Sequence, residues 1–374
     1  MKKTTTNRHE RDLVELTGLP TAAGREDRVV AWVKRWAGRR KNVELKTDRY
    51  GNLMLKRVGV SSRRPIVFTA HLDHPAFVVT EANGKTVTAE FRGGVHDAYF
   101  VGSKVRHYPG DKSVKPSPPG TIRELQAPEA GGFKTVTVDF RQKIEAQPGD
   151  VMTWDVGPSQ IKAGQLHAPA CDDLAGAAAM FAAYSELLKK RKTTSGGADV
   201  RLLCTRAEEV GFVGAIAACK SGIIPKNARL IALENSKSFA ESPLGGGPIV
   251  RVGDRTSTFD PELTLAVGQV AAAIEAADTS FKWQRKLMTG GTCEASAYQA
   301  LGYTATCVCL PLGNYHNMNE DRGVIEREFI DLADYHSLVR LLIGIGESLD
   351  NPATNVPLTD RLEQLFRDRR SLLG

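Results

Sequence analysis

The chain has 374 residues, with 50 Lys or Arg against 43 Asp or Glu and a formal net charge of +7. Hydrophobic residues make up 41% and charged residues 25%, a globular composition that excludes a disordered polymer, a collagen-like repeat and a coiled-coil rod. At about 100 to 200 residues per domain, this length predicts two domains, or one large α/β domain with an insertion.

Three features predict where the protein works. The six cysteines form no Cys-x-x-Cys pair and are too few for a disulfide framework in a chain of this length. The most apolar stretch, residues 175–183, is far shorter than the roughly 20 residues that a membrane-spanning helix needs. The basic N-terminal segment lacks the apolar region of a signal peptide. We therefore expect a soluble, cytoplasmic protein that does not bind membranes.

An α/β pattern begins in the segment 1–76. Apolar residues recur at three- and four-residue spacing in segments 13–16 and 29–36, which predicts two helices. Residues 43–57 predict a hairpin around a turn rich in residues that tolerate positive φ. Residues 65–70 form an apolar run typical of a buried strand, and this run ends at His71. In open α/β sheets, ligands bind at that end of the strands.

The pattern between positions 77 and 164 is different, with short β-like runs, Gly and Pro turns and no helical period. The predicted strands there are 85–91, 100–108, 134–141 and 151–156. Beyond them we predict helices at 174–190, 214–220, 261–277, 328–349 and 360–373, and strands at 200–205 and 229–233. This order predicts an α/β fold, with a mostly parallel mixed sheet covered by helices on both faces. Residues 1–76 and 165–374 would form the catalytic domain, and residues 77–164 an inserted small all-β domain.

Histidine and carboxylate residues occur where predicted strands end, in five separate segments. They are His71 with Asp73, Asp172 with Asp173, Glu208 with Glu209, Glu234, and His316. Several carboxylates at one sheet edge would repel one another, because like charges within a few Å disfavour joint ionisation. Metal cations remove that repulsion. Nitrogen and oxygen ligands without thiolates suit Zn²⁺, Co²⁺ or Mn²⁺ in an open catalytic site.

These segments also have local interpretations. Asp172 and Asp173 precede a predicted helix and could form an N-cap pair. Asp73 lies two residues after His71 and could fix its tautomer by binding the second imidazole nitrogen. Glu208 and Glu209 could divide the work, one binding metal and the other handling protons. Glu234 and His316 are individually weak signals, supported only by their place at strand ends.

As an ordered set, the motifs resemble the dinuclear metallo-aminopeptidases of the glutamyl aminopeptidase and tetrahedral aminopeptidase type, over nearly the whole chain. The matching motifs are Asn52-Leu53, His71 with Asp73, Gly93-Gly94, Asp172-Asp173 with Gly176, Glu208-Glu209-Val210-Gly211, Gly245-Gly246-Gly247, Gly290-Gly291-Thr292 and His316. The resemblance implies two divalent metal ions, zinc first, with cobalt or manganese as alternatives. It implies that His71 and Glu234 bind one ion, that Glu209 and His316 bind the other, and that Asp172 bridges both.

The resemblance also implies the reaction, which is removal of N-terminal residues from peptide substrates by a hydroxide held between the ions. Glu208 would be the general base, and Asp73 would join the catalytic set through His71. The peptide bond between Asp172 and Asp173 is expected to be cis. The inserted domain would serve as a lid and as the contact between subunits of a homo-oligomer.

Departures from the family pattern lie beside the expected ligands, at His74-Pro75-Ala76, Leu174 and Cys293-Glu294-Ala295. They keep open a related dinuclear carboxypeptidase, or a deacylase of N-acyl amino acids or peptides, and, as a lesser alternative, a non-catalytic peptide-binding relative. Nucleic acid is not an expected partner. The segment 1–64 holds 17 Lys or Arg and seven Asp or Glu, a net charge of +10. The positive excess therefore lies outside the catalytic segments.

Overall fold

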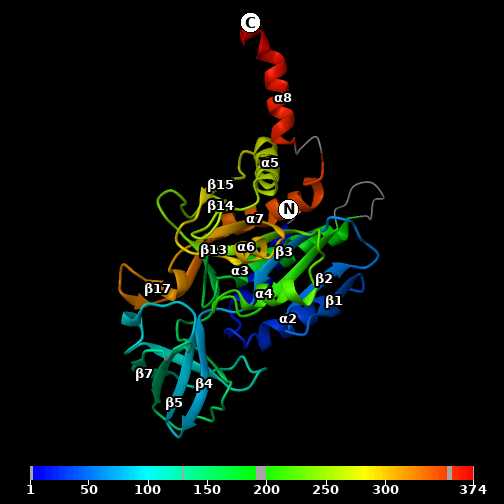
Figure 1. Ribbon diagram of the computed structural model, residues 1–374. Helices are drawn as coiled ribbons and strands as arrows, with labels where there is room; N and C mark the ends of the chain where they lie inside the picture. Colours follow the sequence, from blue (N-terminus) through cyan, green and yellow to red (C-terminus); the bar gives the residue numbers. More distant parts are fainter. Residues whose placement is uncertain (1–2, 129, 191–198, 352–355, 374) are drawn as a thin grey trace.

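The computed structural model describes residues 3–128, 130–190, 199–351 and 356–373. A mixed sheet lies at the centre of the larger part of the molecule (Figure 1). Its strands are β1 (Val43–Thr47), β2 (Leu53–Arg57), β3 (Ile66–His71), β12 (Val200–Thr205), β13 (Arg229–Lys237), β14 (Ile249–Gly253), β15 (Gln284–Leu287) and β16 (Thr304–Leu312). Within the described ranges, these eight strands follow the order β1-β2-β12-β3-β13-β16-β14-β15. Four neighbouring pairs are parallel and three are antiparallel.

Helices cover both faces of this sheet, because successive side chains of each strand point to opposite faces. One face carries α1 (Lys3–Thr17), α2 (Asp27–Gly38), α3 (Leu174–Lys189), α5 (Pro261–Ala277) and α7 (Leu332–Ser348), and the other carries α4 (Val213–Ser221) and α6 (Glu294–Ala300). In β3, for example, Phe68 belongs to the same apolar cluster as α3, whereas Val67 belongs to the cluster of α4 and α6. The predicted α/β class and mixed sheet are confirmed.

Between positions 76 and 154, where only position 129 is not described, six strands close into a barrel in the order β4-β5-β8-β7-β6-β9. They are β4 (Ala76–Asn83), β5 (Thr86–Arg92), β6 (Lys104–Tyr108), β7 (Gly120–Gln126), β8 (Lys134–Phe140) and β9 (Val151–Trp154). An aromatic cluster fills its interior, with Phe77 against Phe91 and Trp154 at ring-centroid distances of 4.9 and 4.7 Å. The barrel has its own apolar core, separate from the cores on the two sides of the sheet.

The described residues form two further, smaller sheets. One contains β10 (Gln160–Lys162), β11 (Gln165–Ala168) and β19 (Glu328–Asp331), and the other contains β17 (Met318–Asn319) and β18 (Val324–Ile325). The strand β19 pairs antiparallel with β11. After leaving the barrel, the chain thus passes through β11 beside a segment from near its C-terminal end, and then enters α3.

Three element predictions were wrong in part. Residues 328–331, predicted as helix, form β19, because they pair with β11, and Asp331 then caps α7 by accepting N–H bonds from Ala333 and Asp334. The strand predicted at 229–233 continues to Lys237, because it pairs with β16 along its whole length. Residues 97–99, outside the predicted strand that starts at position 100, form a 3₁₀ turn (η1, Asp97–Tyr99), and that strand begins only at Lys104.

The predicted C-terminal helix is present as α8 (Leu358–Arg369), followed by the short 3₁₀ helix η3 (Arg370–Leu373). Figure 1 shows α8 pointing away from the sheet, at the end of the molecule opposite the barrel. Among the described residues, no helix combines the length and the apolar character needed to cross a lipid bilayer.

The contact between α2 and α3 generates a stability prediction. Phe181 of α3 is fully buried and packs against Trp32 and Trp36 of α2, with ring centroids 5.3 and 4.9 Å away. We expect Phe181→Ala to lower the free energy of unfolding by about 3–5 kcal/mol, because it leaves a cavity in a close-packed core. Urea unfolding measures this loss. Phe239, which is 41% exposed, provides the control, since Phe239→Ala should change stability by less than about 0.5 kcal/mol. Equal losses in the two variants would contradict the assignment.

Candidate metal centre

The predicted site residues come together at one edge of the sheet. His71 is the last residue of β3, Glu208 and Glu209 lie in the loop that begins after β12 ends at Thr205, and Glu234 lies in β13. Because these three strands are parallel neighbours, their C-terminal ends meet at the same edge. His316 lies just beyond β16, the next parallel neighbour, in the 3₁₀ turn η2 (Tyr315–Asn317).

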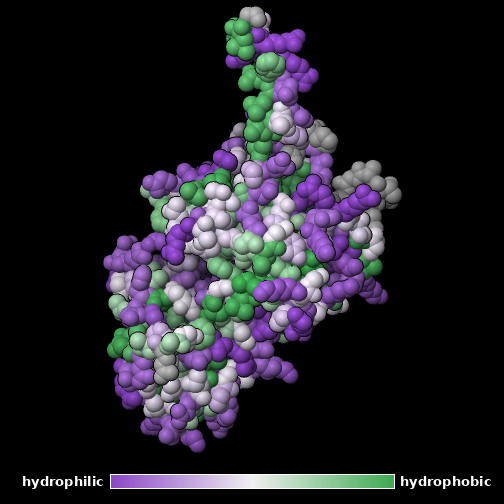
Figure 2. Space-filling view, viewed as in Figure 1, coloured by the Kyte–Doolittle hydropathy of each residue, from purple (hydrophilic) through white to green (hydrophobic). Residues whose placement is uncertain are grey.

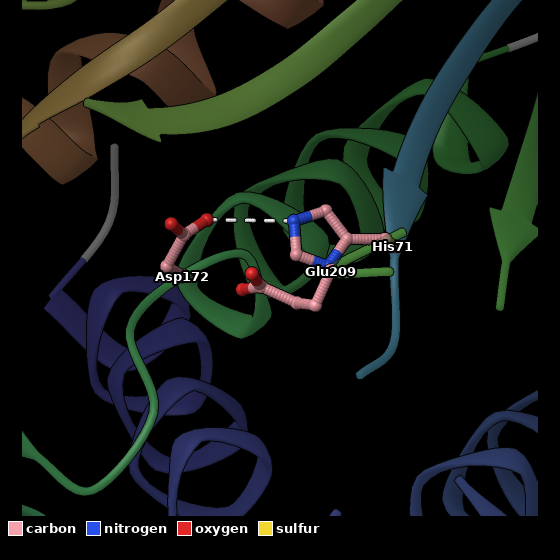
Figure 3. Close-up of side chains that lie close together, drawn as sticks. All are labelled: His71, Asp172 and Glu209. Atoms are coloured by element: carbon pink, nitrogen blue, oxygen red, sulfur yellow. Dashed lines mark ion pairs between the residues drawn. The ribbon is translucent and has the colours of Figure 1, made fainter. Parts of the chain in front are cut away.

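Asp172 lies between the two histidines. Its Oδ1 is 3.4 Å from Nε2 of His71, and its Oδ2 is 3.6 Å from Nε2 of His316. Figure 3 shows the carboxylate of Asp172 facing the His71 ring, with the Glu209 side chain directed to the same space. Single ligand atoms of His71, Asp172 and Glu209 all lie within 4.8 Å of one another. Oε2 of Glu209 is also 3.5 Å from Nε2 of His316.

The arrangement fits a bound divalent cation. Oδ1 of Asp172 and Oε1 of Glu209 are buried and have no hydrogen-bond partner, although an unpaired buried acceptor costs folding free energy. The distances of 3.4 to 3.6 Å between imidazole nitrogens and carboxylate oxygens exceed those of strong charge-assisted hydrogen bonds. Imidazole nitrogens and carboxylate oxygens, with no thiolate among them, are ligands that suit Zn²⁺ and related metals.

The electrostatics of the cluster support the same conclusion. Burial, together with the charges of Glu209 and Asp73, raises the pKa of Glu208 well above its ordinary value. Burial and the charge of Asp172 likewise raise the pKa of Glu209 and the pKa of Glu234. The carboxylates therefore resist ionising together, and a positive ion among them would relieve the repulsion.

Glu234 contributes its charge but no direct contact. Its side chain is buried in β13, and the negative charges of Asp172 and Glu208 help to raise its pKa. In the described part of the chain, it makes no hydrogen bond or ion pair with the other predicted ligands. Its place as a ligand therefore remains a prediction.

Asp73 has a wider role than the sequence suggested. Its Oδ1 is 3.6 Å from Nδ1 of His71, close to the contact expected from the spacing. Its two carboxylate oxygens also accept the backbone N–H bonds of Glu208 and Glu209, each at 3.0 Å. The carboxylate of Asp73 therefore positions the loop that carries both glutamates, and its backbone carbonyl oxygen, 3.2 Å from Nδ1, holds the imidazole of His71.

Glu328 is a positioning residue that sequence reasoning missed, because it lay inside a predicted helix. It is fully buried in β19. Its Oε2 accepts N–H bonds from Cys171 (2.6 Å) and Asp172 (3.0 Å), and its Oε1 accepts the N–H of His316 (2.8 Å). One side chain thus ties together two segments that lie far apart in the sequence. The alternation of Glu328 and Ile330, both facing inward, is the sequence signal that could have found it.

Two more buried residues hold the backbone of the site. Nδ1 of His74 is 2.7 Å from the carbonyl oxygen of Asp172. Burial lowers the pKa of His74 to about 4, so its neutral ring donates this bond. Glu26 accepts the N–H of Ala207 at 3.0 Å and pairs with Arg206 at 2.6 Å, next to the loop of Glu208.

The N-cap interpretation of the aspartate pair was wrong for the side chains. Asp173 occupies the N-cap position of α3, but its side chain makes no capping hydrogen bond. Both of its carboxylate oxygens are buried without a hydrogen-bond partner. The peptide bond between Asp172 and Asp173 is cis, as the resemblance implied.

A pocket of about 100 Å³ lies beside the cluster. Glu234 and Tyr315 are among the residues that line it, and the Tyr315 ring stacks on His316 with 3.8 Å between ring centroids. Arg251 lines the same pocket and is only 3% exposed. Its Nη1 donates to Oγ of Ser236 at 3.3 Å, while its Nε has no hydrogen-bond partner among the residues that the structure describes.

A mixed sheet covered on both faces, with imidazoles and carboxylates gathered at the C-terminal edge of its parallel strands, defines the class of α/β metallohydrolases. The family model of the M42 glutamyl aminopeptidases matches residues 51–341, and the chain belongs to this family. It is a metal-dependent aminopeptidase, a hydrolase of peptide bonds, so the resemblance found in the sequence is confirmed. The carboxypeptidase and deacylase alternatives are not favoured.

Solved structures show the same fold. The TET1 peptidase of Pyrococcus horikoshii matches with a TM-score of 0.73 and 20% identity, over 91% of this chain and 99% of that one. An aminopeptidase from Desulfurococcus kamchatkensis gives a TM-score of 0.72 and 20% identity, over 94% and 99% of the two chains. A TET aminopeptidase from a Thaumarchaeota archaeon of marine sediment gives 0.75 and 19%, over 93% and 98%. No curated protein sequence matches the chain.

The contacts of Glu328 generate a prediction on metal binding. Glu328→Gln replaces an acceptor oxygen by an amide that opposes backbone N–H groups, and so disturbs Asp172 and His316 together. We expect metal affinity to fall about 10- to 100-fold, as it does when partners of metal ligands are lost. Competition with a chromogenic chelator measures the affinity. Glu320→Gln is the matched control, because Glu320 is exposed and pairs with Lys237 away from the ligands. Unchanged affinity in Glu328→Gln would contradict the assigned role.

Proposed function

We propose that the centre holds two divalent metal ions, zinc in the native enzyme, bridged by Asp172. The support is the position of its carboxylate, which presents one oxygen to His71 and the other to His316. In this proposal His71 and Glu234 complete one metal site, and Glu209 and His316 complete the other. When bound, such ions supply a water of lowered pKa and polarise the scissile carbonyl.

Glu208 is the proposed general base. Its carboxylate is buried, lies 3.9 Å from Nε2 of His71, and has a raised pKa. A raised pKa brings a carboxylate closer to the operating pH, where it can take a proton and give it back. Glu208 would take the proton of the attacking water on its Oε2 and deliver it to the nitrogen of the departing amine. Asp73 keeps Glu208 in place through the backbone N–H bond.

We propose further that the enzyme prefers an acidic N-terminal residue. The single observation that carries this preference is the guanidinium of Arg251, which is buried, lines the pocket beside Glu234, and has an unpaired Nε. Arginine remains charged in proteins and binds carboxylates through paired donors. The α-ammonium group of the substrate would lie against the carboxylates of the cluster. The family name, glutamyl aminopeptidase, agrees with an acidic side chain.

For assembly, we propose that residues 77–164 form an inserted domain that borders the site and joins subunits in a homo-oligomer. The carbonyl oxygen of Gly94, in the loop after β5, is 2.5 Å from Nδ1 of His316, so this part of the chain already contributes to the site. The TET1 peptidase of P. horikoshii is described as assembling into a tetrahedron or an octahedral shell. Six free thiols agree with a reducing, cytoplasmic location.

Replacing Glu208 tests the mechanism. Glu208→Gln keeps the size of the side chain but removes the proton acceptor, so we expect kcat to fall about 10²- to 10⁴-fold. Metal content, measured by elemental analysis of the purified protein, should stay at the level of the unaltered enzyme. A variant that keeps its metal and also keeps near-normal turnover would show that another group is the base. A variant that loses its metal would place Glu208 among the ligands instead.

Replacing Arg251 tests the substrate preference. We expect Arg251→Met to lower kcat/KM for a glutamyl anilide roughly 30- to 1,000-fold. This corresponds to a loss of about 2–4 kcal/mol of transition-state binding. Activity on a leucyl anilide should change little, since that side chain needs no cation. Lys237→Met is the control, because Lys237 lines the same pocket but is 41% exposed and paired with Glu320. Equal losses on both anilides would rule out a role in side-chain selection.

A further inference from the structure

The helix α8 exposes its whole surface to solvent. No residue of α8 or η3 is buried. Six large apolar side chains in this segment are between 48% and 81% exposed, and we call them the apolar stripe: Leu358, Leu362, Leu365, Phe366, Leu372 and Leu373. Figure 2 shows these hydrophobic residues along the segment that projects from the molecule.

The spacing of the stripe indicates a contact face. Within α8, Leu358, Leu362, Leu365 and Phe366 are separated by three, four, seven or eight positions, apart from the adjacent pair Leu365 and Phe366, which places them on one side of the helix, and Leu372 lies seven positions after Leu365 in η3. The helix α8 has 12 residues, and a helix this short with no packed face is only marginally stable in water. Clustered exposed apolar groups mark interaction sites. The family match ends at position 341, so α8 lies outside the part of the chain that the family model describes.

We propose that α8 pairs antiparallel with α8 of a second copy of this chain. In a pair centred on Leu365, Leu358 of each copy packs against Leu372 of the other. The pattern of charges selects this direction. Arg361 and Asp368 lie on the same flank of the stripe, four positions before and three positions after the centre. An antiparallel pair therefore places Arg361 beside Asp368 of the second copy, twice.

A parallel pair would be electrostatically worse. Arg369 lies within the stripe, so a parallel pair would place the two Arg369 side chains against each other, whereas an antiparallel pair separates them and places each Arg369 level with position 361 of the second copy, between Leu358 and Leu362. The shape of the molecule also favours the antiparallel pair. The chain enters α8 from the catalytic body at Leu358 (Figure 1). Antiparallel helices would hold the two bodies at opposite ends, and parallel helices would crowd them at one end.

The polar side of α8 argues against a membrane surface as the occupant. Acidic Asp360, Glu363 and Asp368 alternate there with arginines, whereas helices that bind anionic membranes are rich in Lys and Arg on the polar face. The barrel, proposed above as the contact in a larger assembly, lies at the other end of the molecule (Figure 1). Pairing through α8 therefore does not depend on the chemistry of the metal centre or on contacts of the barrel.

Disulfide mapping in the full-length protein tests both the pairing and its direction. The variant Leu358→Cys/Leu372→Cys carries thiols about 20 Å apart along the continuous segment of α8 and η3, too far for a disulfide within one chain. We expect oxidation to give covalent dimers on a denaturing, non-reducing gel. Because trypsin cuts at Arg361 and Arg370, mass spectrometry can identify the linked peptides. Links between position 358 and position 372 support the antiparallel pair. Links of each position to itself, or no covalent dimer, would overturn it.

Two controls make the result specific. Arg367→Cys places one thiol on the opposite side of the helix and should remain monomeric on the same gel, as should the unaltered chain, whose cysteines are buried except for the partly buried Cys219. In the double-cysteine background, Arg361→Asp should lower the dimer yield several-fold, and adding Asp368→Arg should restore it. Failure of that restoration would overturn the charge pairing.

Co-sedimentation of the unaltered protein with phosphatidylglycerol vesicles, lost on Leu362→Asp, would also overturn the proposal in favour of a membrane.

Discussion

The constraint on which the site depends is the burial of several carboxylates in one place. Asp172, Glu208, Glu209 and Glu234 are all largely shielded from water at the C-terminal edge of the sheet. For most of them, burial and mutual repulsion raise the pKa. For Asp172, burial also acts to raise the pKa, but the imidazoles of His316 and His71, 3.6 and 3.4 Å from its two oxygens, favour the ionised form and hold the pKa below its ordinary value. The carboxylate with an imidazole on each side is therefore the one that stays ionised, which is the property required of a bridging ligand.

A second set of buried acids holds the clustered residues in place. Each of these acids accepts hydrogen bonds from backbone N–H groups and does not face the proposed metal site. Asp73 holds the loop of Glu208 and Glu209, Glu26 holds Ala207 in the same loop, and Glu328 holds both Asp172 and His316. Backbone N–H groups are fixed dipoles, and hydrogen bonds from them stabilise a buried carboxylate in its ionised form. The ligands are thus positioned by chain segments that are tied together directly, even though they come from five distant parts of the sequence.

The sequence predicted the residues that gather at the sheet edge, but not the buried acids that support them, for a physical reason. His71, Glu208 and Glu209 could be predicted because each follows an apolar strand, and strand ends are visible as local patterns. Glu328 could not, because its strand exists only through pairing with β11, which is remote in the sequence. The same holds for β13, which extends past Glu234 through its pairing with β16. The barrel was expected as short strands between turns, but their closure depends on long-range pairing that no local period reveals.

The charges around the site also support the proposed preference for an acidic N-terminal residue. The cluster presents carboxylates, and Arg251 presents a cation in the adjoining pocket beside Glu234. A free N-terminal glutamate carries the complementary pair, an ammonium group and a side-chain carboxylate separated by a few bonds. An N-acylated residue lacks the ammonium group and would place an uncharged amide against carboxylate oxygens that the metal ions do not neutralise. A C-terminal residue likewise brings no ammonium group. The arrangement of the carboxylate cluster beside the pocket that contains Arg251 therefore favours the amino end of a peptide, which agrees with the aminopeptidase activity of the family.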